Sequence, residues 1–261
     1  MMNNTKIVFF DIDGTLLNYE TLILSEKTIE VLHGLQERGI KICIATGRAP
    51  STIPKFEGIE FDAYLTFNGS YCYTKDGEEI FNNPIAREDV KQLLRNAENI
   101  DKPVSIAVRS RLAANGSSPD LEAYYTFASL KLEIAEDFDE VVEHDDVYQV
   151  MLACSQEEHE KMLQNVDTVK ITGWWDKAID IIPGDGGKGR GIEEILAYYG
   201  FDKSESMAFG DGGNDIEMLQ TVGIGIAMEN AKDEVKAIAD DVCGHVAEDG
   251  IYHYCVEHHL I

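Results

Sequence analysis

The 261-residue sequence predicts an α/β protein: a doubly wound parallel sheet with a second, α+β unit inserted into it. Two observations lead to this fold. Near both ends of the chain, short apolar runs that fit buried strands alternate with helical patterns, as in parallel α/β sheets. Between them, the alternation gives way to shorter, mixed elements. We therefore expect a sheet domain of residues 1–82 and 184–261, and an inserted α+β domain of residues 83–183.

The first expected strand, residues 7–10, is a run of four apolar residues, which suits a strand buried on both faces. Asp11 and Asp13 follow it directly, and Gly14 then allows the chain to turn. Carboxylates at the end of a buried strand are costly unless they pair, bind a metal or take part in chemistry. A polar turn that caps the next helix remains the alternative for this motif taken alone.

The other elements of the sheet domain follow from apolar spacing and from residues that start or stop helices. Ser25 can cap a helix that Gly39 ends, because serine suits the first position and glycine the position after the last turn. Further strands are expected at residues 40–45, 63–67, 207–209 and 224–228, a hairpin at 71–82, and helices at 189–199, 216–222 and 231–239.

Four of the expected strands end in polar residues. These are Asp11 with Asp13, then Thr46, Asn68 and Asp211. In an open α/β sheet, ligands bind beyond the carboxyl ends of the strands, so these side chains should converge on one edge. That convergence favours a functional site over a set of unrelated turns.

The inserted region mixes both kinds of element. Helices are expected at residues 88–97 and 157–166, strands at 104–108 and 148–153, and a hairpin of residues 169–172 with 178–182. The acidic run of residues 133–146 is expected to be a solvated face.

The charge balance limits the partners. The chain has 22 Lys+Arg against 48 Asp+Glu and a net charge of -26, a field that repels nucleic acid and anionic membranes, so we expect neither as a partner. A phosphate site would have to reverse this sign locally. Five dispersed cysteines fit reduced thiols, and no apolar signal segment opens the chain, so a cytoplasmic location is expected. The oligomeric state stays open.

Several segments together resemble a known family. DIDGTLL (residues 11–17), ATGR (45–48), Lys188 followed by glycine, and GDGGND (210–215) resemble, in order and spacing, the four motifs of the haloacid dehalogenase (HAD) superfamily. FNG (67–69), DIIPGDGGKG (180–189) and AMENA (227–231) are similar to its Cof-like sugar-phosphatase branch with a type IIB cap. The resemblance implies that the inserted unit is a cap that reads the substrate.

The resemblance also implies a reaction. Asp11 would be the nucleophile that forms an aspartyl phosphate, and Asp13 the general acid and then the general base. It implies a Mg²⁺ ion bound by Asp11, by the backbone carbonyl of Asp13 and by Asp211, since Mg²⁺ prefers oxygen ligands.

Other motif residues would hold the phosphoryl group. The resemblance assigns this role to Thr46, the Gly47 amide, Lys188 and Asn214, which would offset the growing negative charge. Asp215 would hold Lys188 or a metal-bound water. Each residue alone has an ordinary explanation: Asn214 could simply cap a helix, and Lys188 could be a solvated side chain.

Candidate contacts to the rest of the substrate are Asn68, Arg48, Arg109, Trp174 and Trp175. Adjacent tryptophans in an expected turn suit a sugar ring or a heterocycle, but packing between domains or a dimer contact would explain them equally well. Arg48 is also expected as a surface charge at the start of a helix.

The function expected from these features is a Mg²⁺-dependent phosphomonoester hydrolase acting on a small phosphorylated metabolite, with a sugar phosphate as the first choice. A phosphomutase or phosphotransferase of the same fold, or a non-catalytic sensor of phosphorylated ligands, remain alternatives. A sensor predicts the loss of a motif carboxylate, and none is missing. A dehalogenase would leave Asp13 and Asp211 without a task. The segment GDGGKG (184–189) matches a dinucleotide-binding pattern, but it does not open the first strand–helix unit.

Overall fold

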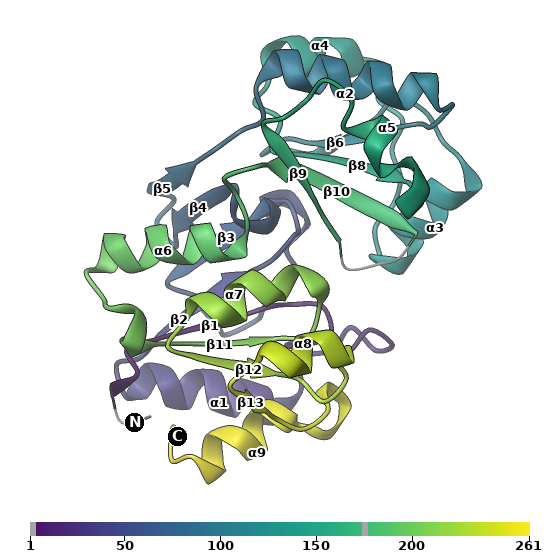
Figure 1. The fold of residues 1–261 in the computed structure, drawn as a ribbon. Coiled ribbons are helices and arrows are strands. Elements are labelled where there is room, and N and C mark those ends of the chain that lie inside the picture. The colour runs from purple at the N-terminus through teal and green to yellow at the C-terminus, as the bar shows by residue number, and fades with distance from the viewer. Residues whose placement is uncertain (1–3, 174–176) are drawn as a thin grey trace. The chain divides into compact units, whose positions relative to one another are not determined.

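The computed structural model describes residues 4–173 and 177–261 (Figure 1). The chain forms two compact units. The core unit comprises Met1–Gly47, Pro54–Asn82 and Lys188–Ile261, and the inserted unit comprises Arg48–Ile53 and Asn83–Gly187.

Within the described residues, the core unit is built on an eight-stranded sheet with β1 (Ile7–Phe10) near its centre. β1 runs parallel to β2 (Lys41–Ala45) on one side and to β11 (Ser206–Gly210) on the other. β3 (Ala63–Thr66), β12 (Ile224–Ala227) and β13 (Asp241–Val242) extend the parallel part, while β4 (Tyr71–Thr74) and β5 (Glu79–Asn82) add an antiparallel edge. The strand order is β13-β12-β11-β1-β2-β3-β4-β5, so the predicted parallel sheet is confirmed.

Helices cover both faces of this sheet, as Figure 1 shows. α6 (Lys188–Tyr199), α7 (Ile216–Thr221) and α8 (Asp233–Ile238) pack on the face to which β1 turns Ile7 and Phe9. α1 (Glu26–Glu37) and α9 (Gly250–Glu257) pack together on the other face, where the stacked rings of Phe10 and Phe209 lie and the Tyr254 ring meets Phe209 edge-on. Alternate residues of β1 thus enter two cores, which is why its apolar run has no polar gap.

Local signals set the ends of α1. The Ser25 hydroxyl accepts a hydrogen bond from the Thr28 amide at 3.1 Å, which satisfies one of the unpaired donors of the first turn. Gly39 follows the helix with a φ of +74°, a conformation that glycine adopts without strain. Both sequence predictions for this helix are confirmed.

The inserted unit contains a five-stranded antiparallel sheet in the order β7-β6-β8-β10-β9. Its strands are β6 (Ser105–Ala107), β7 (Leu112–Ala114), β8 (Gln149–Ala153), β9 (Val169–Thr172) and β10 (Ala178–Pro183). α2 (Arg87–Asn99), α4 (Phe138–His144) and α5 (His159–Met162) build the apolar core on one face. α3 (Pro119–Phe127) contacts β8.

Two expectations for this unit need correction. The acidic run of residues 133–146 is not only a solvated face, because it contains α4, whose Phe138, Val141 and Val142 are buried at helical spacing among charged residues. The helix expected at residues 157–166 is much shorter, since α5 ends at Met162. Helix α3 and strand β7 were not predicted at all.

No helix in the described parts of the chain combines the length and the apolar character that crossing a bilayer requires.

Candidate active site

Asp11 stands at the carboxyl end of β1, where its backbone amide still donates to the Phe209 carbonyl of β11 at 3.1 Å. The chain then turns at Gly14, whose φ is +87°. A Cβ at this position would lie 2.3 Å from Asp211 Oδ2 and 2.4 Å from a ring carbon of Tyr19. Only glycine therefore lets this loop pass so close to the carboxylates.

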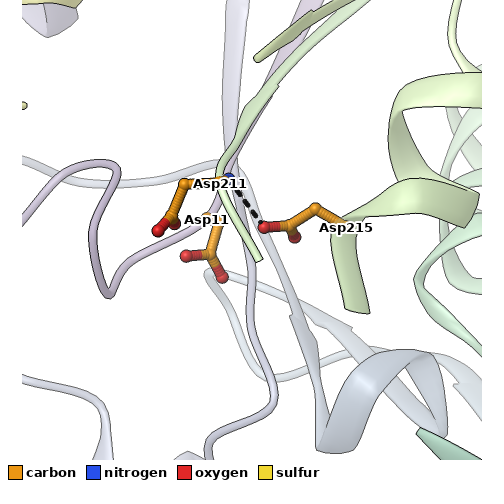
Figure 2. Close-up of side chains that lie close together, drawn as sticks. All are labelled: Asp11, Asp211 and Asp215. Atoms are coloured by element: carbon orange, nitrogen blue, oxygen red, sulfur yellow. Dashed lines mark hydrogen bonds between the residues drawn. The ribbon is translucent and has the colours of Figure 1, made fainter. Parts of the chain in front are cut away.

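Three buried carboxylates gather at this edge of the core sheet (Figure 2). Asp11 comes from the end of β1, Asp211 from the residue after β11, and Asp215 from the residue before α7. One oxygen of each lies within 4.8 Å of the others. Such a set of hard oxygen donors suits a cation such as Mg²⁺, whereas three adjacent buried anions without a cation would repel one another.

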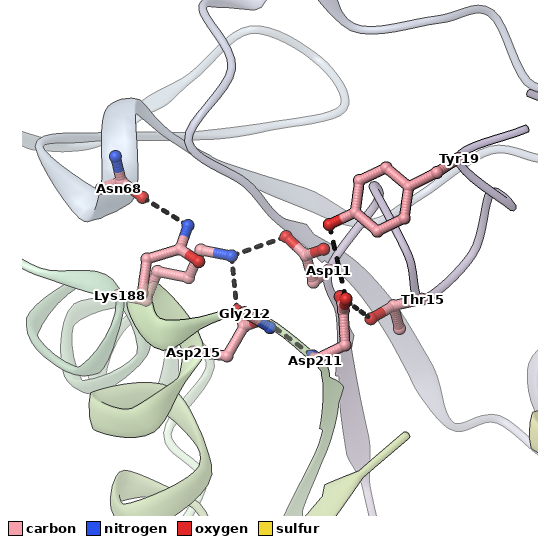
Figure 3. A network of polar contacts seen from close by, with 9 residues as sticks. Asp11, Thr15, Tyr19, Asn68, Lys188, Asp211, Gly212 and Asp215 are labelled. Atoms are coloured by element: carbon pink, nitrogen blue, oxygen red, sulfur yellow. Dashed lines mark hydrogen bonds and ion pairs between the residues drawn. The ribbon is translucent and has the colours of Figure 1, made fainter. Parts of the chain in front are cut away.

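Lys188, the first residue of α6, supplies one positive charge to this cluster (Figure 3). Its Nζ lies 2.6 Å from Asp11 Oδ1 and 2.6 Å from Asp215 Oδ1, and its side chain is fully buried. Burial works against the ammonium, but the two carboxylates outweigh it, so the pKa of Lys188 is raised. The lysine therefore stays charged at every physiological pH.

Asp215 has both of its oxygens engaged. Oδ2 accepts the backbone amides of Asp211 and Gly212, both at 2.9 Å, and Oδ1 accepts from Lys188. This carboxylate therefore holds the turn after β11 and aims Lys188 at Asp11. Although it belongs to the carboxylate cluster, most of its lone pairs are taken by these hydrogen bonds, so its contacts suit an anchor for the lysine.

Three side chains donate to Asp211. The Thr15 hydroxyl lies 3.1 Å from Oδ1, while the Tyr19 hydroxyl and the Asn230 amide lie 3.4 Å and 3.3 Å from Oδ2. Burial, followed by the charge of Asp215, raises the pKa of Asp211 to about 7. Without a cation, this carboxylate is thus only partly ionised at neutral pH.

Asp11 is affected in the same direction. Burial raises the pKa of its carboxyl well above the ordinary value, Lys188 opposes that shift, and the charges of Asp215, Asp211 and Asp13 add to it. One lysine therefore does not neutralise the cluster. A bound divalent cation would restore the ionised forms, so the donors present fit a metal site.

A second group of motif residues meets beside the cluster. Asn68, buried and with a φ of +53°, donates its backbone amide to the Thr46 carbonyl at 3.0 Å, and its Oδ1 accepts from Asn214 Nδ2 at 2.9 Å. A Cβ on Gly47 would come within 3.0 Å of the Asn68 amide group. The structure thus joins Thr46, Gly47, Asn68 and Asn214 at the ends of β2 and β3 and the turn after β11.

A model of haloacid dehalogenase-like hydrolases matches residues 8–255 of the chain. The chain belongs to this family. The YkrA protein of Bacillus subtilis (strain 168) is similar to it, with 32% identity over 95% of both chains. Pyridoxal phosphate phosphatase YbhA of Escherichia coli (strain K12) is 28% identical over 97% of this chain and 98% of its own.

Among solved structures, the HAD subclass IIB sugar phosphatase BT4131 superimposes with a TM-score of 0.90 and 34% identity, covering 98% of this chain and 100% of its own. The chain is thus a Cof-like, subclass IIB HAD phosphatase, and the resemblance stated from its motifs is confirmed. Small phosphorylated metabolites are its substrate class.

The other HAD positions named from the sequence are not all assembled with the cluster. Asp13 is half-buried, and its charge acts on the Asp11 carboxyl. Arg48 belongs to the inserted unit, where it donates to the carbonyl of Ala128 at 3.2 Å. Arg109 is exposed in the turn between β6 and β7. Trp174 and Trp175 lie outside the described residues, so their expected contact with substrate stays a prediction.

Sequence reasoning missed three contributors to the HAD site, namely Thr15, Tyr19 and Asn230. Thr15 and Asn230 lie in segments that the family resemblance had singled out, DIDGTLL and AMENA, but no role was given to either. Tyr19 had no signal, because an aromatic residue in a polar loop does not show which distant side chain it meets. All three donate hydrogen bonds to Asp211. Thr15 and Tyr19 lie more than 190 residues before Asp211 in the chain.

Proposed function

We propose that this phosphatase hydrolyses sugar phosphates with Mg²⁺ as its cofactor and a phosphorylated Asp11 as its intermediate. The observation that carries the proposal is Lys188, a fully buried ammonium held 2.6 Å from both Asp11 and Asp215 beside Asp211. In a chain with a net charge of -26, this ammonium and the proposed divalent cation would together supply the positive charge that a phosphate group needs. A purely structural ion pair would not need a further carboxylate at its side.

In the first step, a carboxylate oxygen of Asp11 attacks phosphorus, and the bond between phosphorus and the leaving oxygen breaks. Asp13 in its protonated form donates its proton to the departing alkoxide. The half-buried position of Asp13, close enough for its charge to act on Asp11, supports this role.

In the second step, a water attacks the phosphorus of the aspartyl phosphate and the bond to Asp11 breaks. Asp13, now ionised, takes the proton of that water. Phosphate leaves, and both carboxyls return to their starting state. Asp11, Asp211 and the Asp13 carbonyl would hold Mg²⁺, which supplies positive charge against the phosphoryl oxygens when bound.

Thr46, the Gly47 amide, Lys188 and Asn214 are proposed to hold the phosphoryl oxygens. Their support is the network through Asn68 described above, which fixes the Asn214 amide and the loop after β2. Fixed donors stabilise developing charge without reorganising during the reaction, which is how most of the catalytic effect arises in phosphoryl transfer.

The inserted unit, assigned as the cap, would read the leaving group. Arg109, Trp174 and Trp175, with Arg48 and Asn68, are the proposed contacts to the sugar. The choice of a sugar phosphate is supported by the higher identity to BT4131, a sugar phosphatase, than to YbhA, a pyridoxal phosphate phosphatase.

The test is phosphate release from a panel of hexose phosphates, pentose phosphates and pyridoxal phosphate, with Mg²⁺ and with EDTA. We expect the highest kcat/KM on a sugar phosphate and loss of turnover in EDTA. Equal rates in both conditions would rule out the metal-dependent mechanism, and preference for pyridoxal phosphate would rule out the sugar assignment. With a sugar bisphosphate, isomerised product in place of free phosphate would identify a phosphomutase.

A further inference from the structure

Asn230 links three loops at the carboxyl edge of the core sheet. It lies shortly after β12, which pairs in parallel with β11, and the Met228 amide continues this pairing by donating to the Gly210 carbonyl at 3.0 Å. This pairing brings the turn after β12 next to Asp211. The Asn230 side chain is half-buried there.

The contacts of Asn230 determine how its amide is oriented. Its Oδ1 accepts from the Val246 backbone N–H at 3.1 Å. Its Nδ2 donates to the Gly14 carbonyl at 2.8 Å and to Asp211 Oδ2 at 3.3 Å. A backbone N–H can only donate, whereas a carbonyl and a carboxylate can only accept, so the flipped amide would lose every one of these contacts.

These hydrogen bonds act on the two parts of the proposed metal site at once. Asp211 is held from both oxygens, by Thr15 on Oδ1 and by Asn230 on Oδ2. Through the Gly14 carbonyl, the same amide also holds the loop that carries Asp13. Asn230 therefore links the loop that carries Asp13 to the Asp211 carboxylate.

We propose that Asn230 is a positioning residue for Asp211, which it holds in the orientation that binds the divalent cation. This inference rests on the proposed function, because it presupposes that Asp211 binds the metal. Residues that orient a metal-binding carboxylate typically change metal affinity about 10- to 100-fold when they are replaced. Asn230 itself need not contact the metal.

The test is calorimetric titration of the 261-residue protein with MgCl₂ in the absence of substrate. We expect Asn230→Ala to bind Mg²⁺ about 10- to 100-fold more weakly than the wild type. The matched control is Asn83→Ala, because Asn83 also donates its amide to an aspartate, Asp185, at 2.9 Å, but within the inserted unit. Its affinity for Mg²⁺ should be unchanged.

A second measurement, phosphate release at different Mg²⁺ concentrations, distinguishes a positioning role of Asn230 from a general structural defect. In the Asn230→Ala variant, excess Mg²⁺ should restore phosphate release while the KM for substrate stays unchanged; a structural defect would lower turnover at all Mg²⁺ concentrations. Wild-type affinity in a folded Asn230→Ala variant would overturn the inference, and so would an equal loss in Asn83→Ala. If Asn230→Ala does not fold, Asn230→Ser, whose hydroxyl is too short to reach both acceptors, is titrated in its place.

If the wild type binds no Mg²⁺, the proposed cofactor is wrong, and so is the proposed role of Asn230. If the wild type binds Mg²⁺ and the variant binds it equally well, only the role of Asn230 is wrong.

Discussion

The two units of this phosphatase both bury aspartates, but they satisfy them in different ways. In the inserted unit, Asp180 is almost fully buried in β10 and accepts a hydrogen bond from the Tyr124 hydroxyl at 2.6 Å. In the core unit, Asp11 and Asp215 share Lys188, and Asp211 lies in the same cluster of carboxylates.

Among the described residues of the inserted unit, Asp180 is a single buried carboxylate, whereas Asp11, Asp211 and Asp215 form a cluster of three in the core unit. The Tyr124 hydroxyl gives the buried Asp180 carboxylate a hydrogen-bond partner, as buried polar groups require. Buried carboxylates with too little positive charge beside them have raised pKa values, as Asp11 and Asp211 do. Their ionised forms are unfavourable, and a bound cation would stabilise those forms. The excess negative charge, and not burial alone, therefore marks the site.

The largest effect should come from Asp11→Asn. We expect kcat to fall by at least about 10⁴-fold, because the nucleophile is lost. The same variant should be no less stable than the wild type in EDTA at pH 8, because its folded state no longer holds an ionised Asp11 against the unfavourable field. Phosphate release and thermal melting check both parts, and a variant that keeps its turnover would refute the mechanism.

Lys188→Met should cost stability as well as activity. Removing one partner of a buried ion pair typically costs about 3–5 kcal/mol, because an uncompensated charge remains. Urea unfolding in EDTA measures this cost. An unchanged free energy of unfolding at pH 8 would show that the carboxylates are neutral without the lysine.

Tyr124→Phe provides the opposite case in the inserted unit. Loss of a buried donor should destabilise the protein by about 1–3 kcal/mol, because the Asp180 carboxylate loses a partner. Mg²⁺ affinity should not change, since this pair lies in a different unit from the carboxylate cluster. A change in Mg²⁺ affinity with unchanged stability would show that this pair acts on the metal site and not on the stability of its own unit.

The smallest effect concerns pH. The pKa of Asp211 is raised to about 7, so the metal-free protein loses stability as pH rises from the ordinary carboxyl range through 7. Because the proton competes with the cation, Mg²⁺ affinity should fall by up to about tenfold per pH unit below 7. Stabilisation by Mg²⁺ should therefore be larger at pH 8 than at pH 6, and thermal melts at both values test this. Equal stabilisation would place the Asp211 pKa well below 7.

Much of this architecture could be predicted from the sequence because it depends on local patterns. The apolar run before Asp11 and the capping serine of α1 act through neighbours in the chain, and the motif carboxylates were identified from their order and spacing. Polar residues at the carboxyl ends of parallel strands share one edge of the sheet. Asp11, Thr46, Asn68 and Asp211 could therefore be assigned to one site. The short elements of the inserted unit, such as α3 and β7, were missed because their patterns are brief.

Only the tertiary structure decided how the charges are shared. The family resemblance implied that Lys188 and the aspartates belong to one site, but not that Lys188 bridges Asp11 and Asp215 while Asp211 is held by Asn230. Lys188 and Asp11 are 177 residues apart, and hydrogen bonds at such separations depend on side-chain directions that strand pairing and helix packing set. The sequence therefore determined which groups meet, and the packing of α6 and the turns after β11 and β12 determined which of them pair.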